Sequence, residues 1–279
     1  MDALHAILIA ILQGATELFP VSSLGHAVVI PALFNWKLDQ HSGAFLPFLV
    51  LLHAGTSVAL LLYFWRDWWA MVAGVLGLSG PAATKASRRL FLRIVVATIP
   101  AVVFGFTLNK FFKELFDNPM IAAGFLVLNG LMLLFGERLR GRGGVRELES
   151  ITYKDAVIVG FWQCGALFPG ISRSGATIVG GLLRGVTHEA AAHFSFLIAL
   201  PVIVGATVLE VPKLLRAPLP PGVLILAMEA AVLAGITAYL STWFLMRYFR
   251  ANDKWALNPF AYYCLVFGVG SLAWLRFGA

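Results

Sequence analysis

Apolar positions along the chain fall into six long runs, each as long as a membrane-crossing helix. A bilayer span needs about 20 largely apolar residues. The runs that meet this length are about 44–65, 90–112, 119–137, 190–211, 222–247 and 257–275. Trp65, Trp255 and Trp274 stand at their ends, where interfacial anchors are expected. The pattern predicts an all-α integral membrane protein with six transmembrane helices, whose longest loops are the polar segments 66–89 and 138–155.

Two further apolar regions, 4–34 and 156–186, are interrupted near their middle by Pro, Gly and Ser. Each leaves two arms of roughly 11–16 residues, which is too short to cross alone. Irregular backbone at membrane depth is tolerated only where protein or a polar cavity surrounds it. The lengths therefore predict two re-entrant helix hairpins. A signal peptide is the alternative for the first region, but the segment lacks a basic n-region and contains Gln13 and Glu17.

The two interrupted regions resemble each other, and we call their polar parts the first tip (residues 13–26) and the second tip (residues 163–177). Gln13 through Ser22-Ser23-x-Gly25 aligns with Gln163 through Ser172-Arg173-x-Gly175. Three spans follow each tip, so a single membrane domain, 1–279, would hold halves of about 1–137 and 152–279 joined by the loop 138–151. An odd number of spans per half predicts two inverted-topology repeats with the site between them near the midplane. A chance match of short apolar motifs is the alternative.

The composition supports a membrane protein. Hydrophobic residues make up 59% of the chain and charged residues 13%, against roughly 25% charged in an ordinary soluble domain. These values exclude a soluble globular domain and intrinsic disorder. Cys164 and Cys264 lack CxxC spacing and indicate neither a disulfide framework nor a zinc site. Basic loops facing anionic lipid, with an anionic substrate, account for the net charge of +7, so no nucleic-acid partner is expected.

Lysine and arginine counts predict the orientation. One face carries 14 of these residues: Arg66, Lys85, Arg88, Arg89, Arg93, Arg138, Arg140, Arg142, Arg146, Lys154, Arg184, Arg247, Arg250 and Lys254. The other face carries six: Lys37, Lys110, Lys113, Lys213, Arg216 and Arg276. The richer face should be cytoplasmic, which places both termini on the opposite side.

Ionisable and polar groups gather in the two tips, and at membrane depth such groups are candidates for function. They are Gln13, Glu17, Ser22, Ser23, His26, Ser172, Arg173, Ser174 and Thr177. Helix N-termini with hydroxyl groups bind anions, and the Arg173 guanidinium suits phosphate oxygens. Glu17 can hold a divalent cation or orient a nucleophile, and His26 can transfer protons. The combination predicts phosphoryl chemistry.

Each residue also has a structural interpretation. Ser22, Ser23 and Ser172 suit helix N-caps, and Arg173 could simply neutralise Glu17. His26 could be a buried structural histidine. His53 and Glu229 lie within predicted spans and are interpreted as structural.

Each tip contains a long motif: Gln13-Gly-Ala-Thr-Glu17-Leu-Phe-Pro-Val-Ser22-Ser23-Leu-Gly25-His26 in the first, and Pro169-Gly-Ile-Ser172-Arg173-Ser174-Gly-Ala-Thr177 in the second. These motifs are similar to the two signatures of the undecaprenyl pyrophosphate phosphatase family of the bacitracin-resistance type, which the chain therefore resembles. The resemblance implies a multi-pass enzyme of the bacterial inner membrane. It would hydrolyse undecaprenyl diphosphate to the monophosphate and phosphate, recycling the lipid carrier for peptidoglycan synthesis and conferring bacitracin resistance. Its site would face the periplasm, as would both termini, and would depend on a divalent cation, Mg²⁺ or Ca²⁺.

The resemblance also implies roles for single residues. Glu17 matches a metal-binding or nucleophile-orienting position, and Gln13 stands where many members carry Glu, so one carboxylate of a two-carboxylate metal site is absent. Ser23 and His26 match positions proposed for nucleophile and proton transfer. Arg173 matches the centre of a diphosphate-binding set, which further comprises Ser22, Ser172, Ser174 and Thr177.

Three alternatives stay open from the sequence. The nucleophile is either Ser23 or a water. The inverted repeats could instead belong to a transporter or flippase of a lipid phosphate or another anion. The protein contacts membrane lipids, and it is either a monomer or a homo-oligomer.

Overall fold

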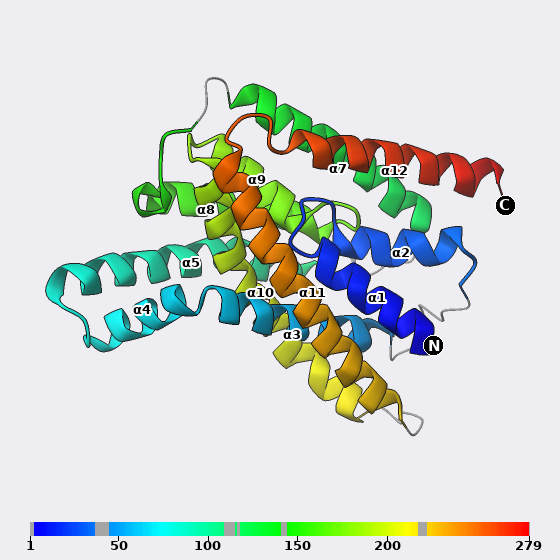
Figure 1. Cartoon of the computed structure of the whole chain (residues 1–279), viewed down its shortest axis with the longest axis horizontal. Helices are drawn as coiled ribbons and strands as arrows, with labels where there is room; N and C mark the ends of the chain where they lie inside the picture. The colour runs from blue at the N-terminus through cyan, green and yellow to red at the C-terminus, as the bar shows by residue number, and fades with distance from the viewer. Residues whose placement is uncertain are drawn as a thin grey trace.

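A computed structural model describes residues 3–36, 45–108, 115, 118–140, 144–216 and 222–278, without the side chains of 45–47, 210, 211 and 213–216. Lys37, Lys110, Lys113 and Arg142 of the orientation count lie outside the described residues, as do residues 141–143 of the predicted connecting loop. The helices of the described part are α1 (Ala3–Thr16), α2 (Ser23–Leu33), α3 (Phe45–Tyr63), α4 (Trp65–Leu76), α5 (Pro81–Thr107), α7 (Pro119–Leu139), α8 (Tyr153–Cys164), α9 (Arg173–Leu182), α10 (His188–Arg216), α11 (Val223–Ala251) and α12 (Asn258–Phe277), with short 3₁₀ turns η1 (Leu148–Ser150) and η2 (Gly165–Leu167) (Figure 1).

Five of these helices are long and apolar enough to cross a membrane: α5, α7, α10, α11 and α12. The pair α3 and α4 passes the same test together but is bent by 76° at the residue between them, so the described part has six spans if this pair is one. No strand occurs in the described ranges, where Arg146 and Val186 form one isolated bridge. The prediction of an all-helical, multi-pass membrane protein is therefore confirmed.

The prediction of a long loop over 66–89 is wrong. Most of this segment is helical, because α4 occupies its first half and α5 begins at Pro81. Proline suits the first turn of a helix, where its missing N–H leaves no bond unmade. α4 packs against α5, with Gly74 beside Ser87, and the pair projects from the rest of the molecule (Figure 1).

Both interrupted regions are pairs of short helices separated by a break at the predicted position. α1 and α2 flank the first break, and α8 and α9 flank the second. The helix after each break is capped by serine: Ser22 Oγ accepts the Gly25 N–H at 3.3 Å and Ser172 Oγ accepts the Gly175 N–H at 3.1 Å. At Gly170, φ is +105° and a Cβ would lie 2.3 Å from the Ala122 carbonyl oxygen, so this turn requires glycine.

The helices approach closely where one of them carries a small residue. α1 crosses α11 at Gly14 against Ala234, and α8 crosses α5 at Gly160 against Ala97. α3 packs against α10 and α11, and α7 lies alongside α12 (Figure 1). Lipid tails are as apolar as leucine, so close packing of this kind is a main source of helix association in a membrane.

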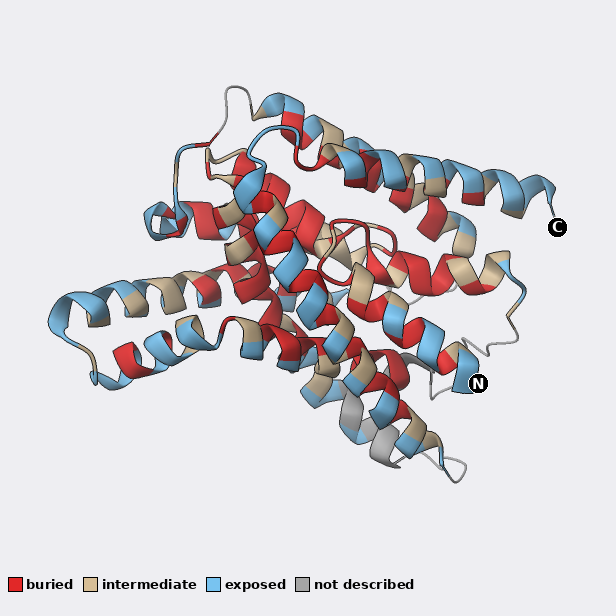
Figure 2. Cartoon of the chain, in the orientation of Figure 1, coloured by how far each residue is buried: buried red, intermediate tan, exposed pale blue. Residues whose placement is uncertain are grey.

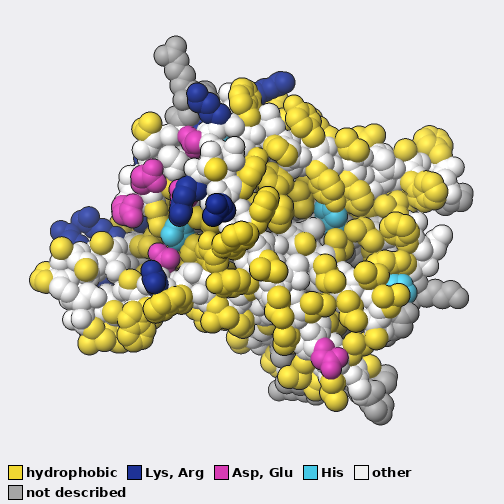
Figure 3. All heavy atoms as spheres, in the orientation of Figure 1, with side chains coloured by type: hydrophobic (Ala, Val, Ile, Leu, Met, Phe, Trp, Pro, Cys, Tyr) yellow, Lys and Arg dark blue, Asp and Glu magenta, His cyan; other side chains and the backbone are white. Residues whose placement is uncertain are grey.

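Buried residues concentrate around the two breaks and along α9, whereas the outer faces of α5, α11 and α12 are exposed (Figure 2). Those exposed faces are apolar, for example at Phe106, Ile236 and Val266, as expected for surfaces that face lipid. Charged side chains gather toward one side of the view in Figure 3, and hydrophobic side chains cover most of the remainder. The two tips are therefore enclosed by protein rather than by lipid.

A polar cluster outside the span-capable helices fixes the start of α8. Asp155 is buried and accepts hydrogen bonds from Arg146 at 2.6 Å, Arg184 at 2.7 Å and the Thr152 N–H at 2.9 Å. Burial alone would raise the pKa of Asp155, but these hydrogen bonds outweigh it and hold the pKa well below its usual range. The carboxylate therefore ties α8 to the segments on either side of it.

We expect Asp155→Ala to lower the free energy of unfolding by about 2 kcal/mol, because both arginines and the helix cap lose their acceptor. Thermal unfolding of detergent-solubilised protein measures this, with the exposed neighbour Lys154→Ala as the matched control. Because the folded pKa is lowered, the stabilisation is present at neutral pH and is lost progressively as the pH falls below about 4. Equal unfolding temperatures for the two variants would contradict this account.

Candidate functional site

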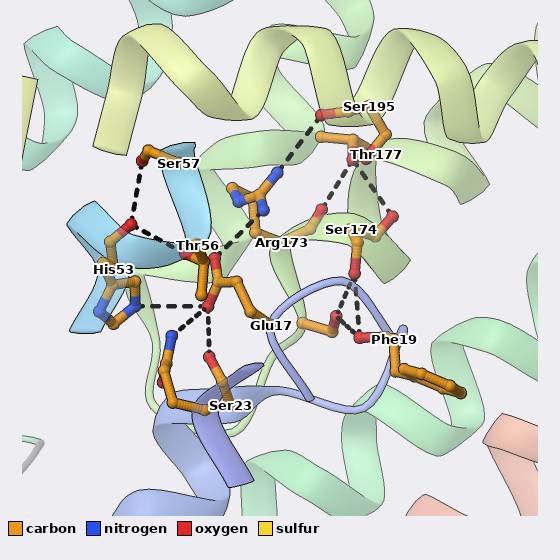
Figure 4. A network of polar contacts seen from close by, with 12 residues as sticks. Glu17, Phe19, Ser23, His53, Thr56, Ser57, Arg173, Ser174, Thr177 and Ser195 are labelled. Carbon is orange, nitrogen blue, oxygen red and sulfur yellow. Dashed lines mark hydrogen bonds and ion pairs between the residues drawn. The ribbon is translucent and has the colours of Figure 1, made fainter. Parts of the chain in front are cut away.

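The two tips meet in the interior, where Glu17 and Arg173 form an ion pair (Figure 4). Glu17 follows α1, and Arg173 is the first residue of α9. An N–H of the Arg173 guanidinium donates to Glu17 Oε1 at 3.2 Å. The two side chains are only 7% and 12% exposed, so water screens their charges weakly. Two regions separated by more than 150 residues thus contribute opposite charges to one place.

Three further side chains contact Glu17 (Figure 4). Its Oε2 accepts from Ser23 Oγ at 2.6 Å and from Gln13 Nε2 at 2.9 Å. His53 Nε2 lies 3.3 Å from the same oxygen. Hydrogen bonds to a charged acceptor are short and strong, which agrees with the short Ser23 contact. The carboxylate therefore orients the Ser23 hydroxyl, which is the position a general base would take.

The hydroxyl groups of the second tip join it to the first. Ser172 Oγ and Ser174 Oγ both contact the Phe19 carbonyl oxygen, at 3.3 and 3.0 Å. Thr177 Oγ1 lies 2.6 Å from Ser195 Oγ of α10 and donates to the Arg173 carbonyl oxygen at 2.8 Å. These bonds satisfy backbone groups that would be costly to leave unpaired in an apolar interior.

The described contacts of Arg173 engage only part of its guanidinium group. One terminal nitrogen contacts Glu17 and the other donates to the Ser195 carbonyl oxygen at 3.3 Å. Both contacts are long for charged hydrogen bonds, and a guanidinium has five N–H groups. The remaining N–H groups can bind an anion without first losing strong bonds.

A cavity of about 280 Å³ opens onto these groups. Its polar lining includes Glu17, Ser23, His53 and Arg173, together with Gln163. Ser22 and Ser172 line it as well, and its apolar wall comes from several segments: Leu24, Leu49, Val50, Ala101, Ala166, Leu167, Ile171, Val202, Ile203 and Ala206. A charged group and an attached hydrocarbon chain would both find matching surfaces here.

His26 is fully buried but lies apart from this cluster. Its Nδ1 lies 2.6 Å from the Ser22 carbonyl oxygen, which only accepts, so Nδ1 carries a proton. Its Nε2 is 2.8 Å from the Tyr263 hydroxyl, and its ring stacks on Phe267. Both ring nitrogens are therefore engaged, and the described contacts of His26 do not include Glu17, Ser23 or Arg173.

From the sequence, His53 is interpreted as structural and left out of the site, but the structure places its ring beside Glu17. Its Nδ1 donates to the Leu49 carbonyl oxygen at 2.7 Å, which turns Nε2 toward Glu17. The available signal was the histidine itself, because an ionisable side chain inside an apolar span is costly without a partner. Sequence spacing could not indicate that α3 passes beside the first tip.

Comparison with known proteins identifies related sequences over nearly the whole chain. A model of the family described as bacitracin resistance protein BacA matches residues 6–270. A protein of Granulibacter bethesdensis named undecaprenyl-diphosphatase is 62% identical over 99% of this chain and 98% of its own length. Proteins with the same name from Acidiphilium cryptum and Gluconacetobacter diazotrophicus are 58% and 53% identical, covering 100% and 97% of this chain and 100% and 96% of their own.

We expect Glu17→Leu to destabilise the protein by about 3–5 kcal/mol, because it leaves the Arg173 guanidinium buried without its counter-charge. The double variant Glu17→Leu/Arg173→Leu should recover part of this loss, since it buries no lone charge. Thermal unfolding in one detergent measures all variants, with exposed Glu229→Leu as the matched control. If the double variant lost as much as the two single variants combined, the ion pair would have no energetic coupling.

Proposed function

The chain belongs to the bacitracin resistance protein BacA family, and we propose that the cavity at Glu17 and Arg173 is where its reaction occurs. The chain is a membrane hydrolase that dephosphorylates undecaprenyl diphosphate, giving undecaprenyl phosphate and inorganic phosphate. The observation that carries our placement of the reaction is a single carboxylate, Glu17, held between a serine of the first tip and the arginine of the second.

In this proposal the diphosphate binds at the second tip, and the polyprenyl chain of the bound substrate lies along the apolar wall of the cavity. Arg173 supplies free N–H groups, and the N-terminus of α9 adds partial positive charge. Ser172, Ser174 and Thr177 surround that N-terminus, and Ser22 lines the cavity from the other side. Burial strengthens the attraction between these groups and the phosphate oxygens.

We assign the attack on the terminal phosphorus to Ser23. As Oγ bonds to that phosphorus, its proton passes to Glu17 Oε2, which already accepts it at 2.6 Å. The bond from the terminal phosphorus to the bridging oxygen breaks, and undecaprenyl phosphate leaves. Water then attacks the phosphoserine, the P–Oγ bond breaks, and Glu17 returns its proton to Ser23, which releases phosphate. The alternative is direct attack by a water that Glu17 deprotonates.

A divalent cation, Mg²⁺ or Ca²⁺, fits the oxygen donors of the first tip. Gln13 Oε1 is buried without a hydrogen-bond partner among the described residues, while the Gln13 amide nitrogen faces Glu17. Gln13 and Glu17 would hold the ion, and hard cations prefer such amide and carboxylate oxygens. The described residues contain no cluster of three or more His, Cys, Asp or Glu side chains, so substrate or water would complete the ligand set. When bound, the ion would neutralise phosphate charge.

The two histidines take different parts in this proposal. His53 holds Glu17 in place, because the bond of its Nδ1 to the Leu49 carbonyl oxygen turns Nε2 toward the carboxylate. His26 supports the Ser22–Ser23 turn through the Ser22 carbonyl oxygen. Proton transfer by His26 stays a prediction, and phosphate release by His26→Gln checks it.

We further propose that the halves 1–137 and 152–279 are inverted repeats with re-entrant tips. In support, α1 of the first half packs against α11 of the second, and α8 of the second packs against α5 of the first. α3 pairs with α10 and α7 with α12, so these contacts have counterparts when the halves are exchanged. The lysine and arginine counts favour a cytoplasmic loop 138–151, periplasmic termini and a site open to the periplasm of the inner membrane.

We predict that purified protein in detergent releases phosphate from undecaprenyl diphosphate. A chelator should slow release, and Arg173→Ala should lower it about 100-fold or more, because the main phosphate donor is lost. Arg247→Ala, at an exposed arginine of α11, is the matched control and should stay near wild type. Absence of release by folded wild-type protein with added Mg²⁺ or Ca²⁺ would favour the transporter alternative.

A second prediction separates the two nucleophiles. Ser23→Ala should lower turnover by about 1,000-fold or more if Ser23 forms the phosphoenzyme. The buried Ser241→Ala of α11 controls for loss of an interior hydroxyl and should retain activity. Near wild-type turnover in Ser23→Ala would exclude the covalent route and leave attack by water.

A further inference from the structure

Asn129, in the middle of α7, has no exposed surface and forms hydrogen bonds to both tips. Its Nδ2 donates to the Pro20 carbonyl oxygen of the first tip at 2.9 Å. Its Oδ1 accepts the Ser172 N–H of the second tip at 2.9 Å. Nδ2 also lies 3.3 Å from Cys264 Sγ on α12. Among the described hydrogen bonds, Asn129 is the side chain from outside the two tips that bonds to both of them.

Burying the Asn129 amide costs free energy, so its hydrogen bonds are needed to offset that cost. A buried amide without partners is destabilising, and the cost is higher in a bilayer, where water is absent. The Asn129 donor and acceptor both reach backbone groups that no helix satisfies. Without Asn129, the Ser172 N–H would lose its described acceptor, and the Pro20 oxygen would keep only the long contact from Cys264 Sγ at 4.0 Å.

The two backbone groups that Asn129 binds are close in sequence to the reacting side chains. Pro20 lies midway between Glu17 and Ser23, and Ser172 directly precedes Arg173. A shift of either backbone group therefore changes the distance between the serine of one tip and the guanidinium of the other. The Asn129 amide, on a helix long enough to span the membrane, therefore fixes the positions of both backbone groups.

We propose that Asn129 is a positioning residue for phosphoryl transfer, setting the two tips at the separation at which Ser23, Glu17 and Arg173 act on one diphosphate. This inference rests on the proposed function. Binding of the diphosphate depends mainly on the second tip, whereas the attack requires both tips in register. Misalignment should therefore lower kcat more than it raises KM.

The first test is Asn129→Leu, which keeps the approximate side-chain size and removes the hydrogen bonds to both tips and to Cys264 Sγ. Per folded, monodisperse molecule, kcat should fall about 10- to 100-fold while KM changes less than about threefold. The control is Thr242→Val on α11, because Thr242 is equally buried and its described hydrogen bond goes to the Ala238 carbonyl oxygen of its own helix. A purely structural role would lower the unfolding temperature and leave turnover per folded molecule unchanged, which would overturn the proposal.

A second variant, Asn129→Asp, keeps the proposal testable if the leucine variant fails to fold. Its carboxyl group still accepts the Ser172 N–H but donates to the Pro20 oxygen only while protonated. The ratio of variant to wild-type turnover should therefore rise as the pH falls, and a flat ratio below one would contradict the proposal. Taking the ratio at each pH cancels the titration of the groups that α2, α9 and α12 bring to this region: His26, Arg173, Tyr263 and Cys264.

The wild-type protein separates the two possible failures. If wild-type protein releases no phosphate, the proposed function fails. If wild-type protein is active and Asn129→Leu matches it in kcat per folded molecule, the positioning role fails and the proposed function stands.

Discussion

The structure depends on one constraint: two stretches of irregular backbone lie in an apolar interior, and their polar groups need partners. Helices satisfy their own N–H and C=O groups, but a break cannot. Ser22 and Ser172 cap the helices that resume, Ser174 reaches Phe19, and Asn129 bonds to both breaks. The same bonds that make the breaks tolerable hold the two tips against each other, so the site is a consequence of how the breaks are stabilised.

A single carboxylate, that of Glu17, connects the polar side chains of the two tips. Glu17 accepts from a serine and a glutamine of its own tip, contacts a histidine of α3, and pairs with the arginine of the second tip. Isolated, it would be too costly to bury, and its partners offset that cost. The long contact with Arg173 leaves room for an anionic phosphate to compete for the guanidinium. In the proposed mechanism, this arrangement would hold Ser23 and the Arg173 guanidinium together before substrate arrives.

The long spans and both breaks could be predicted because they are local properties. Hydropathy over about 20 residues identifies a span, and Pro20, Gly170 and the serines mark where helices stop and resume. The polar residues of segment 66–89 predict a loop, but the segment is largely helical because α4 and α5 pack on each other there. The contacts of His53 and Asn129 with the tips could not be predicted from the sequence. They arise because α3 and α7 pass beside the tips, which depends on tertiary packing. Likewise, the sequence could not indicate that Tyr263 engages His26.

In the proposed mechanism, both tips contact one diphosphate. A structure determined with a non-hydrolysable polyprenyl methylenediphosphonate tests it most directly. We expect the terminal phosphonate to lie within hydrogen-bonding distance of Arg173 and within reach of Ser23, with the hydrocarbon chain against the apolar wall that includes Ile203. A phosphonate that contacted only one tip, or that bound elsewhere on the protein, would contradict the account.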